Sequence, residues 1–121
     1  MNIKQILIAA SIAFAGISAG TAQAHAKLQS SQPQASSTLD VAPKSIRLQF
    51  NEALEPAFSK ISLTDKSNKE ITLPKAELDK ADSKAMVTTV PALSPGPYHV
   101  KWSTLTHDGH KTKGEFDFTV K

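Results

Sequence analysis

Apolar and polar positions alternate along most of the chain after residue 25, the pattern of strands that bury one face. The clearest run places four residues on one side: Tyr98, Val100, Trp102 and Thr104. Shorter alternating runs occur at residues 46–50, 61–63, 71–73, 86–90 and 116–120. Because side chains of a strand point to opposite faces in turn, a period of two predicts strands rather than helices.

Polar or proline-containing segments separate these runs and predict turns. Residues 65–69 favour a hairpin turn, and residues 91–97 favour a loop that leads into the strand at Tyr98. With residues 26–31 as a first strand, the chain has about seven strands. Only residues 75–84 offer an alternative, one or two helical turns. We therefore predict an all-β fold, a Greek-key β-sandwich of the immunoglobulin or cupredoxin kind.

The first 24 residues show a different pattern. Lys4 supplies a basic start, residues 6–17 are mainly apolar, and residues 22–24 read Ala-Gln-Ala. The apolar run is shorter than the ~20 residues needed to cross a bilayer, and small-x-small is the form that signal peptidase accepts. We predict a signal peptide at residues 1–24 and one domain at residues 25–121 that begins with His25. Cleavage after Ala26 is the alternative, and it would remove His25.

Composition narrows the classes of function. The chain has 14 Lys and Arg residues against 11 Asp and Glu residues, a formal net charge of +3. Its lysines are scattered along the sequence, so nucleic-acid binding is not expected. It has no cysteine, which excludes thiolate metal sites and cysteine catalysis. Histidine, carboxylate and methionine side chains and the terminal amine remain as candidate metal ligands.

His25 would have special chemistry as the first residue of the processed chain. Its free amine and its ring Nδ1 can close a six-membered chelate on one metal ion. Because both donors belong to one residue, the chelate needs little additional ordering. A metal must displace the amine proton near neutral pH, since the unperturbed pKa of this group is about 8. The alternative is that a terminal histidine is an accident of cleavage.

A second candidate cluster lies in residues 106–110, between two predicted strands. Asp108 and His110 are two positions apart, so in extended backbone they project to the same side. Gly109 between them permits a turn. A carboxylate and an imidazole that converge in this way suit a divalent metal. A structural hydrogen bond between the two side chains fits the same pattern equally well.

Several short motifs extend along the chain in a specific order. They are His25-x-Lys27-Leu28, Ser31-x-Pro33, Leu48-x-Phe50-x-Glu52, Leu93-x-x-Gly96-x-Tyr98-x-Val100-x-Trp102, and Asp108-x-His110 followed by Gly114-x-x-x-Phe118-x-Val120. In their order and spacing the chain resembles the CopC/PcoC family of periplasmic copper-resistance proteins. The resemblance covers residues 25–121.

The resemblance implies a metal site and a role. His25, Asp108 and His110 correspond to the ligands of one Cu(II) ion per chain, and Glu52 corresponds to an acidic residue near that site. The implied function is copper resistance or homeostasis in the periplasm, as a carrier or sequestering protein rather than an enzyme. The implied partner is a CopD-type inner-membrane copper protein. His107 matches no required ligand and is expected to be exposed.

Well-known members of that family also carry a methionine-rich loop for Cu(I). After removal of residues 1–24 this chain keeps only Met86, which lies in an apolar strand pattern. Because Cu(I) prefers thioether ligands, we expect a site for Cu(II) alone.

Two other functions fit parts of the sequence. A copper monooxygenase also uses an N-terminal histidine chelate with a second histidine, although such enzymes have an extended substrate surface that a short domain cannot easily provide. A metal-free immunoglobulin-like module would make the terminal histidine a coincidence.

Overall fold

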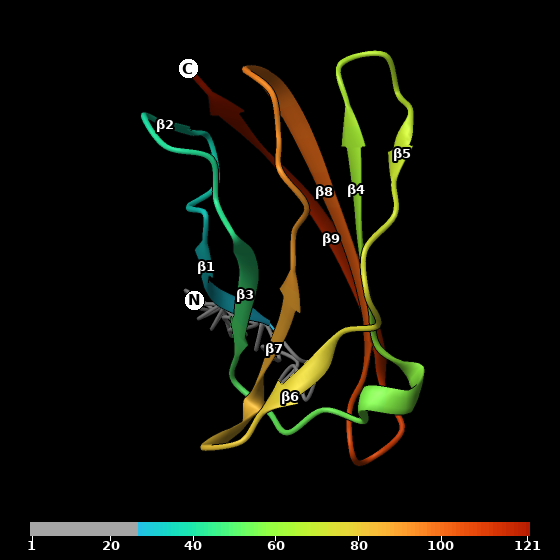
Figure 1. Cartoon of the computed structure of the whole chain (residues 1–121). Helices are drawn as coiled ribbons and strands as arrows, with labels where there is room; N and C mark the ends of the chain where they lie inside the picture. The colour runs from blue at the N-terminus through green and yellow to red at the C-terminus, as the bar shows by residue number, and fades with distance from the viewer. Residues whose placement is uncertain (1–26) are drawn as a thin grey trace, which may run out of the picture.

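The computed structural model describes residues 27–121, which form two β-sheets packed face to face (Figure 1). Apart from one short 3-10 turn, η1, the elements in this range are strands. In chain order they are β1 (Leu28–Gln32), β2 (Ser37–Leu39), β3 (Ser45–Phe50), η1 (Pro56–Phe58), β4 (Lys60–Asp65), β5 (Glu70–Ile71), β6 (Glu77–Asp79), β7 (Asp82–Thr89), β8 (Gly96–Leu105) and β9 (Lys111–Val120).

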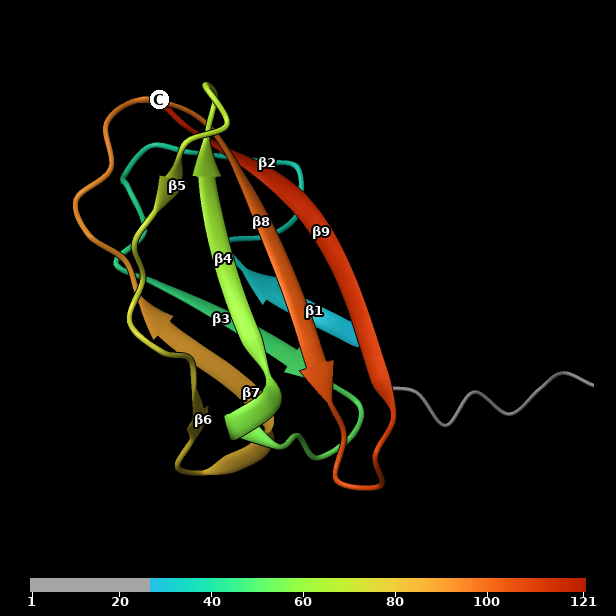
Figure 2. The same cartoon turned by 90° about the vertical axis from the view of Figure 1, so that its right-hand side faces the viewer.

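The chain crosses repeatedly between the two sheets. Sheet A has the strand order β1-β3-β7-β6, and sheet B has the order β2-β9-β8-β4-β5. All neighbouring strands are antiparallel except β2 and β9, which run parallel. Figure 2 looks onto sheet B, with β4, β8 and β9 in front and sheet A behind. The predicted all-β sandwich is confirmed.

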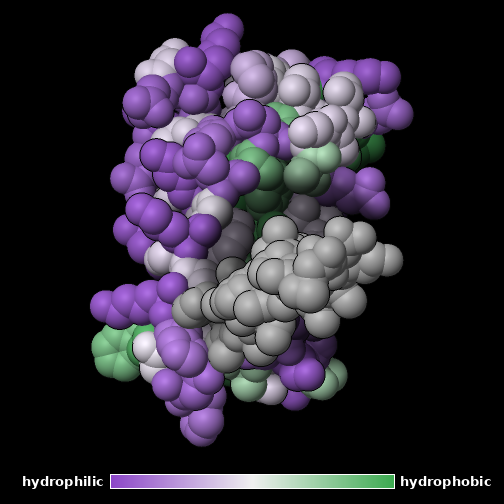
Figure 3. All heavy atoms as spheres, turned by 180° about the vertical axis from the view of Figure 1, so that it is seen from behind, coloured by the Kyte–Doolittle hydropathy of each residue, from purple (hydrophilic) through white to green (hydrophobic). Residues whose placement is uncertain are grey.

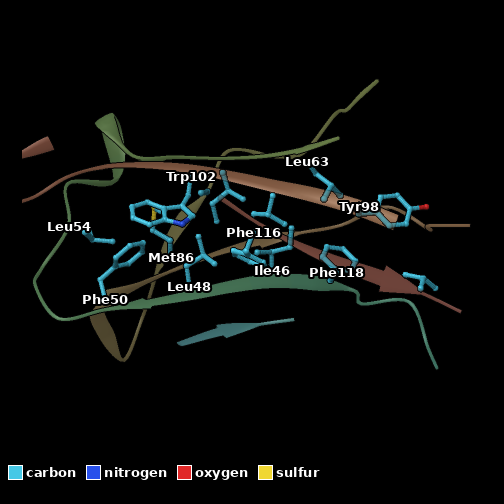
Figure 4. Close-up of a cluster of buried hydrophobic side chains, with 14 residues drawn as sticks. Ile46, Leu48, Phe50, Leu54, Leu63, Met86, Tyr98, Trp102, Phe116 and Phe118 are labelled. Atoms are coloured by element: carbon cyan, nitrogen blue, oxygen red, sulfur yellow. The ribbon is translucent and has the colours of Figure 1, made fainter. Parts of the chain in front are cut away.

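The core lies between the sheets and is built from the alternating apolar positions. Side chains from β3 and β8 point toward each other across it (Figure 4). The Phe50 and Trp102 rings meet edge to face, with centroids 5.0 Å apart, and Tyr98 stacks on Phe118 at 5.5 Å. Several large hydrophobic residues of the core have no solvent-exposed surface: Ile46, Leu48, Phe50, Leu63, Met86 and Val100.

Gly114 makes room for the indole of Trp102. The two residues are paired across β8 and β9. A Cβ added at Gly114 would lie 2.4 Å from Cζ2 of the Trp102 ring, which is far below van der Waals contact. Because Gly114 has no side chain, the Trp102 ring can lie over the backbone of β9 at this position.

Two short strands were not expected from the sequence. We predicted about seven strands, and the described residues contain nine, with β2 and β6 as the additions. Residues 75–84, the helical alternative, instead form β6, a tight turn and the start of β7. Both added strands lie at a sheet edge, so pairing with β9 or β7 determines their conformation. The expected turn at residues 65–69 is confirmed: the Asp65 N–H donates to the Lys69 carbonyl at 3.0 Å.

The surface seen in Figure 3 is largely hydrophilic, with apolar colour confined to a few places. Among large hydrophobic side chains in residues 27–121, only Val41 and Phe58 are strongly exposed. Within the same residues, no helix is long and apolar enough to span a membrane.

Candidate metal centre

The loop between β8 and β9 is a compact turn held by its own backbone. The Thr106 N–H donates to the His110 carbonyl at 2.8 Å, and the Gly109 N–H donates to the Thr106 carbonyl at 2.9 Å. Gly109 has a φ of 92°, a left-handed conformation that suits glycine. This turn brings Asp108 and His110 to the same side, as their spacing predicted.

Asp108 and His110 are in direct contact. Oδ2 of Asp108 lies 3.1 Å from Nδ1 of His110, and both side chains are about half exposed. The Thr106 hydroxyl donates a hydrogen bond to Oδ1 of Asp108. This bond, together with the neighbouring His110 ring, lowers the pKa of Asp108. The carboxylate is therefore ionised at neutral pH, with one oxygen fixed by Thr106 and the other turned toward the imidazole.

The loop rests on the segment that follows β3, and that segment also anchors the first described residue. The Lys27 N–H donates to Oδ1 of Asn51 at 2.7 Å, and the Asn51 N–H donates to the Lys27 carbonyl at 3.2 Å. Two residues after Asn51, the Ala53 carbonyl accepts from the His107 N–H at 3.2 Å. The backbone at Lys27 is therefore tied to the segment that carries the loop.

The other predicted site residues are placed less directly. His25 lies outside the described residues. Glu52 is half buried and lies in the segment between Asn51 and Ala53. Within residues 27–121, no three His, Cys, Asp or Glu side chains form a group that could hold a metal. Of the predicted ligands, the described residues bring Asp108 and His110 into contact.

The remaining histidines and Met86 have other surroundings. The His107 side chain is exposed, as expected, and its Nδ1 lies 2.6 Å from Oε1 of Glu55. His99 lies on the outer face of sheet B, where it contacts Asp117 and Glu115 of β9. The Met86 side chain is fully buried in the core.

Thr106 is the residue whose part in the site the sequence did not predict. It is buried, its hydroxyl donates to Asp108, and the same oxygen accepts from the His110 N–H at 3.0 Å. The available signal is local: a threonine two residues before an aspartate can bond its carboxylate within a turn. Thr106 therefore positions both donors of the pair.

The side chains of Asp108 and His110 form a hydrogen bond, which was the structural alternative for this pair, and they also bring one nitrogen and one oxygen atom close together. The 3.1 Å between them is an ordinary hydrogen-bond distance, and it is also close to the separation of about 2.8 Å between two donor atoms at a right angle on one metal ion with bonds of about 2 Å. The donors lie at an open end of the molecule rather than in its core. Fold and site together define a small β-sandwich with an exposed carboxylate–imidazole pair at one end.

The chain belongs to the CopC domain family, whose model matches residues 28–121. It is 38% identical to protein YobA of Escherichia coli K12 over 99 aligned residues, and this alignment covers 81% of this chain and 80% of that protein. The crystal structure of CopC from Methylosinus trichosporium OB3b superimposes with a TM-score of 0.76 at 32% identity, over 80% of this chain and 94% of that one. PcoC, a methionine-rich copper resistance protein from Escherichia coli, gives a TM-score of 0.68 at 39% identity, over 81% of this chain and all of PcoC (100%).

Proposed function

We propose that this protein binds one Cu(II) ion through the amine and imidazole of His25, the imidazole of His110 and the carboxylate of Asp108. The observation that carries the proposal is how the backbone of Lys27 is held. Lys27 is hydrogen-bonded to Asn51, and Ala53, two residues after Asn51, is hydrogen-bonded to His107 in the loop that contains Asp108. Two further residues reach at most about 7 Å. A processed chain that begins at His25 would therefore have its terminus near the donor pair.

The chemistry of the donors favours Cu(II). An amine, two imidazoles and one carboxylate oxygen form a nitrogen-rich set, which suits the tetragonal geometry of this ion. Affinity for such sites rises to Cu(II) and falls again at Zn(II) along the first-row metals. The only methionine in residues 27–121 is buried in the core, which supports a preference for Cu(II) over Cu(I).

The proposed role is copper resistance or homeostasis in the periplasm, by sequestering Cu(II) or carrying it to a partner. The name of PcoC, a copper resistance protein, supports this role and favours binding over catalysis. The proposed signal peptide at residues 1–24 would deliver the chain to that compartment. A CopD-type inner-membrane copper protein is the partner we propose.

The test compares two processed proteins that differ at the terminus alone. One begins with His25, and the other carries an added Gly before it. The extension converts the amine into an amide, so the chelate is lost and Cu(II) affinity should fall by orders of magnitude. The measurement is a Cu(II) titration against a competing chelator.

Three further measurements accompany this titration. Thermal stability without copper should be nearly equal in the two proteins, because an exposed terminus tolerates added residues. Copper should raise the melting temperature of the His25 protein more than that of the extended one. His110→Ala should weaken binding more than Asp108→Asn, because water can replace a lost carboxylate. Equal Cu(II) affinity of the two forms would disprove the terminal chelate.

A further inference from the structure

The outer face of sheet B gathers three lysines that the sequence leaves far apart. The lysines are scattered along the sequence, and folding brings Lys60, Lys101 and Lys113 together on one face. They come from β4, β8 and β9, which lie side by side in Figure 2. The strand register aligns Lys60 with Ser103 and Ser103 with Lys113 in one row, and Lys101 lies in the next row on the same face.

Sheet geometry sets the spacing of these three residues. Strands lie about 4.8 Å apart and residues on one face recur about every 6.8 Å, so the three lysine Cα atoms are separated by roughly 8–10 Å. This spacing is close to the Debye length of about 8 Å at physiological salt. The fields of the three ammonium groups therefore reinforce one another at the surface between them.

The lysines border a shallow hollow of about 440 Å³ whose rim also includes Ser62 and Ser103. All three lysines are exposed. Among residues 27–121, no carboxylate lies within ion-pair distance of any of them. The hollow thus presents three ammonium groups and, on Ser103, a hydroxyl group that can donate a hydrogen bond, while the Ser62 hydroxyl donates to the Lys101 carbonyl at 3.5 Å.

The same face also carries two acidic residues of β9, Glu115 and Asp117, further from the Asp108 loop. Glu115 borders the hollow, but its Oε2 lies 3.4 Å from Nε2 of His99. Asp117 also contacts His99. Glu115 is the register partner of Lys101, whereas Lys60 and Lys113 lie one row nearer to the Asp108 loop. The most basic part of the face therefore lies next to that loop. Along the strand, Lys113 is three residues from His110, roughly 10 Å.

We propose that this hollow docks an acidic, extended segment of a partner protein. In an extended segment, every second side chain points the same way at intervals of about 6.8 Å. Carboxylates at alternate positions therefore all face the hollow, about 6.8 Å apart, where the flexible side chains of the three lysines can reach them. The intervening side chains point away from the hollow, and the backbone carbonyls of the segment can accept a hydrogen bond from the Ser103 hydroxyl. A bound segment would place its protein beside the loop of Asp108 and His110. The docking itself does not depend on copper.

The test uses the processed protein and a synthetic probe, an acetylated heptapeptide in which Glu and Ser alternate. A peptide with Gln in place of Glu is the uncharged control. Peptide binding is followed by the shifts of backbone amide signals in nuclear magnetic resonance spectra. The Glu peptide should shift signals at residues 60–62, 101–103 and 113–115, and the Gln peptide should not.

Two triple variants of equal net charge separate a specific surface from general attraction. Lys60→Gln/Lys101→Gln/Lys113→Gln should weaken binding of the Glu peptide about tenfold, since three charge pairs of modest strength are lost. Lys44→Gln/Lys66→Gln/Lys80→Gln, at exposed positions elsewhere, should change it less than twofold. Circular dichroism melting verifies that both variants fold.

Three outcomes would overturn the proposal. One is equal weakening in the two triple variants, and another is the absence of localised shifts at millimolar peptide. The third is binding to phosphatidylglycerol vesicles, lost in the first triple variant, without binding of the peptide, which would assign the surface to a membrane.

Discussion

At the scale of single residues, one buried hydroxyl organises the candidate metal centre. Thr106 is 1% exposed, so its oxygen has a well-defined position. From there it bonds both the Asp108 carboxylate and the His110 backbone. Groups that orient metal ligands in this way typically change affinity by 10–100-fold when they are removed.

Thr106→Val should therefore lower Cu(II) affinity about tenfold while the protein stays folded. Thr106→Ser, which keeps the hydroxyl, should retain most of the affinity. Competition with a Cu(II) chelator measures both variants, and thermal melting of the copper-free proteins verifies the fold. If the valine variant bound copper as tightly as the unmodified protein, Thr106 would have no positioning role.

At the scale of elements, the β8–β9 hairpin connects the candidate site to the rest of sheet B. Its two strands are paired from Gly96↔Val120 to Leu105↔Lys111. On the outer face, Nδ1 of His99 contacts Oδ1 of Asp117 across the hairpin. This hydrogen bond is the main cause of a raised pKa at His99, and Glu115 adds to it. Protonated His99 therefore ties β8 to β9.

This contact predicts a stability that depends on pH. Since the folded pKa of His99 lies above its ordinary value of 6.5, its contribution is complete below pH 6.5 and is lost as pH rises through the raised pKa. Urea unfolding between pH 5.5 and 8.5 should give a stability difference between the unmodified protein and His99→Gln that shrinks with rising pH.

Asp117→Asn is the matched control for the histidine variant. It removes the main partner of His99, so its stability difference from the unmodified protein should show the same trend with pH. A difference that is constant with pH in both variants would contradict a protonated His99 in the hairpin.

At the scale of the whole molecule, both sheets depend on one shared core. The chain has no disulfide to hold the sheets together, because it has no cysteine. Leu48 of β3 is completely buried between the layers. Its side chain comes from sheet A and packs in the same cluster as residues of β8 and β9.

Leu48→Ala should therefore cost about 2–5 kcal/mol of unfolding free energy, through lost burial and the cavity left behind. Ser45→Ala, at an exposed position of the same strand, should change stability by less than about 0.5 kcal/mol. Urea unfolding followed by Trp102 fluorescence measures both. A loss below about 1 kcal/mol for Leu48→Ala would mean that the sheets do not rely on this core.

The sequence alone was sufficient to predict the main strands and the convergence of Asp108 and His110. Burial of one face repeats every two residues in a strand, so alternation at Tyr98, Val100 and Trp102 records the core directly. Asp108 and His110 are equally local, because two residues that flank a glycine in a short turn have few ways to diverge. The terminal chelate of His25 is also a hypothesis from sequence, and the Gly extension tests it.

The tertiary structure alone decided the features that depend on distant contacts. Strands β2 and β6 have no clear alternation and form by pairing at the sheet edges. The anchoring of Lys27 by Asn51, and the row that places Lys60 near Lys113, join residues far apart in the chain. Local patterns report which face of a segment is buried. They do not report which segments lie next to each other, because register is set by the packing of the whole sandwich.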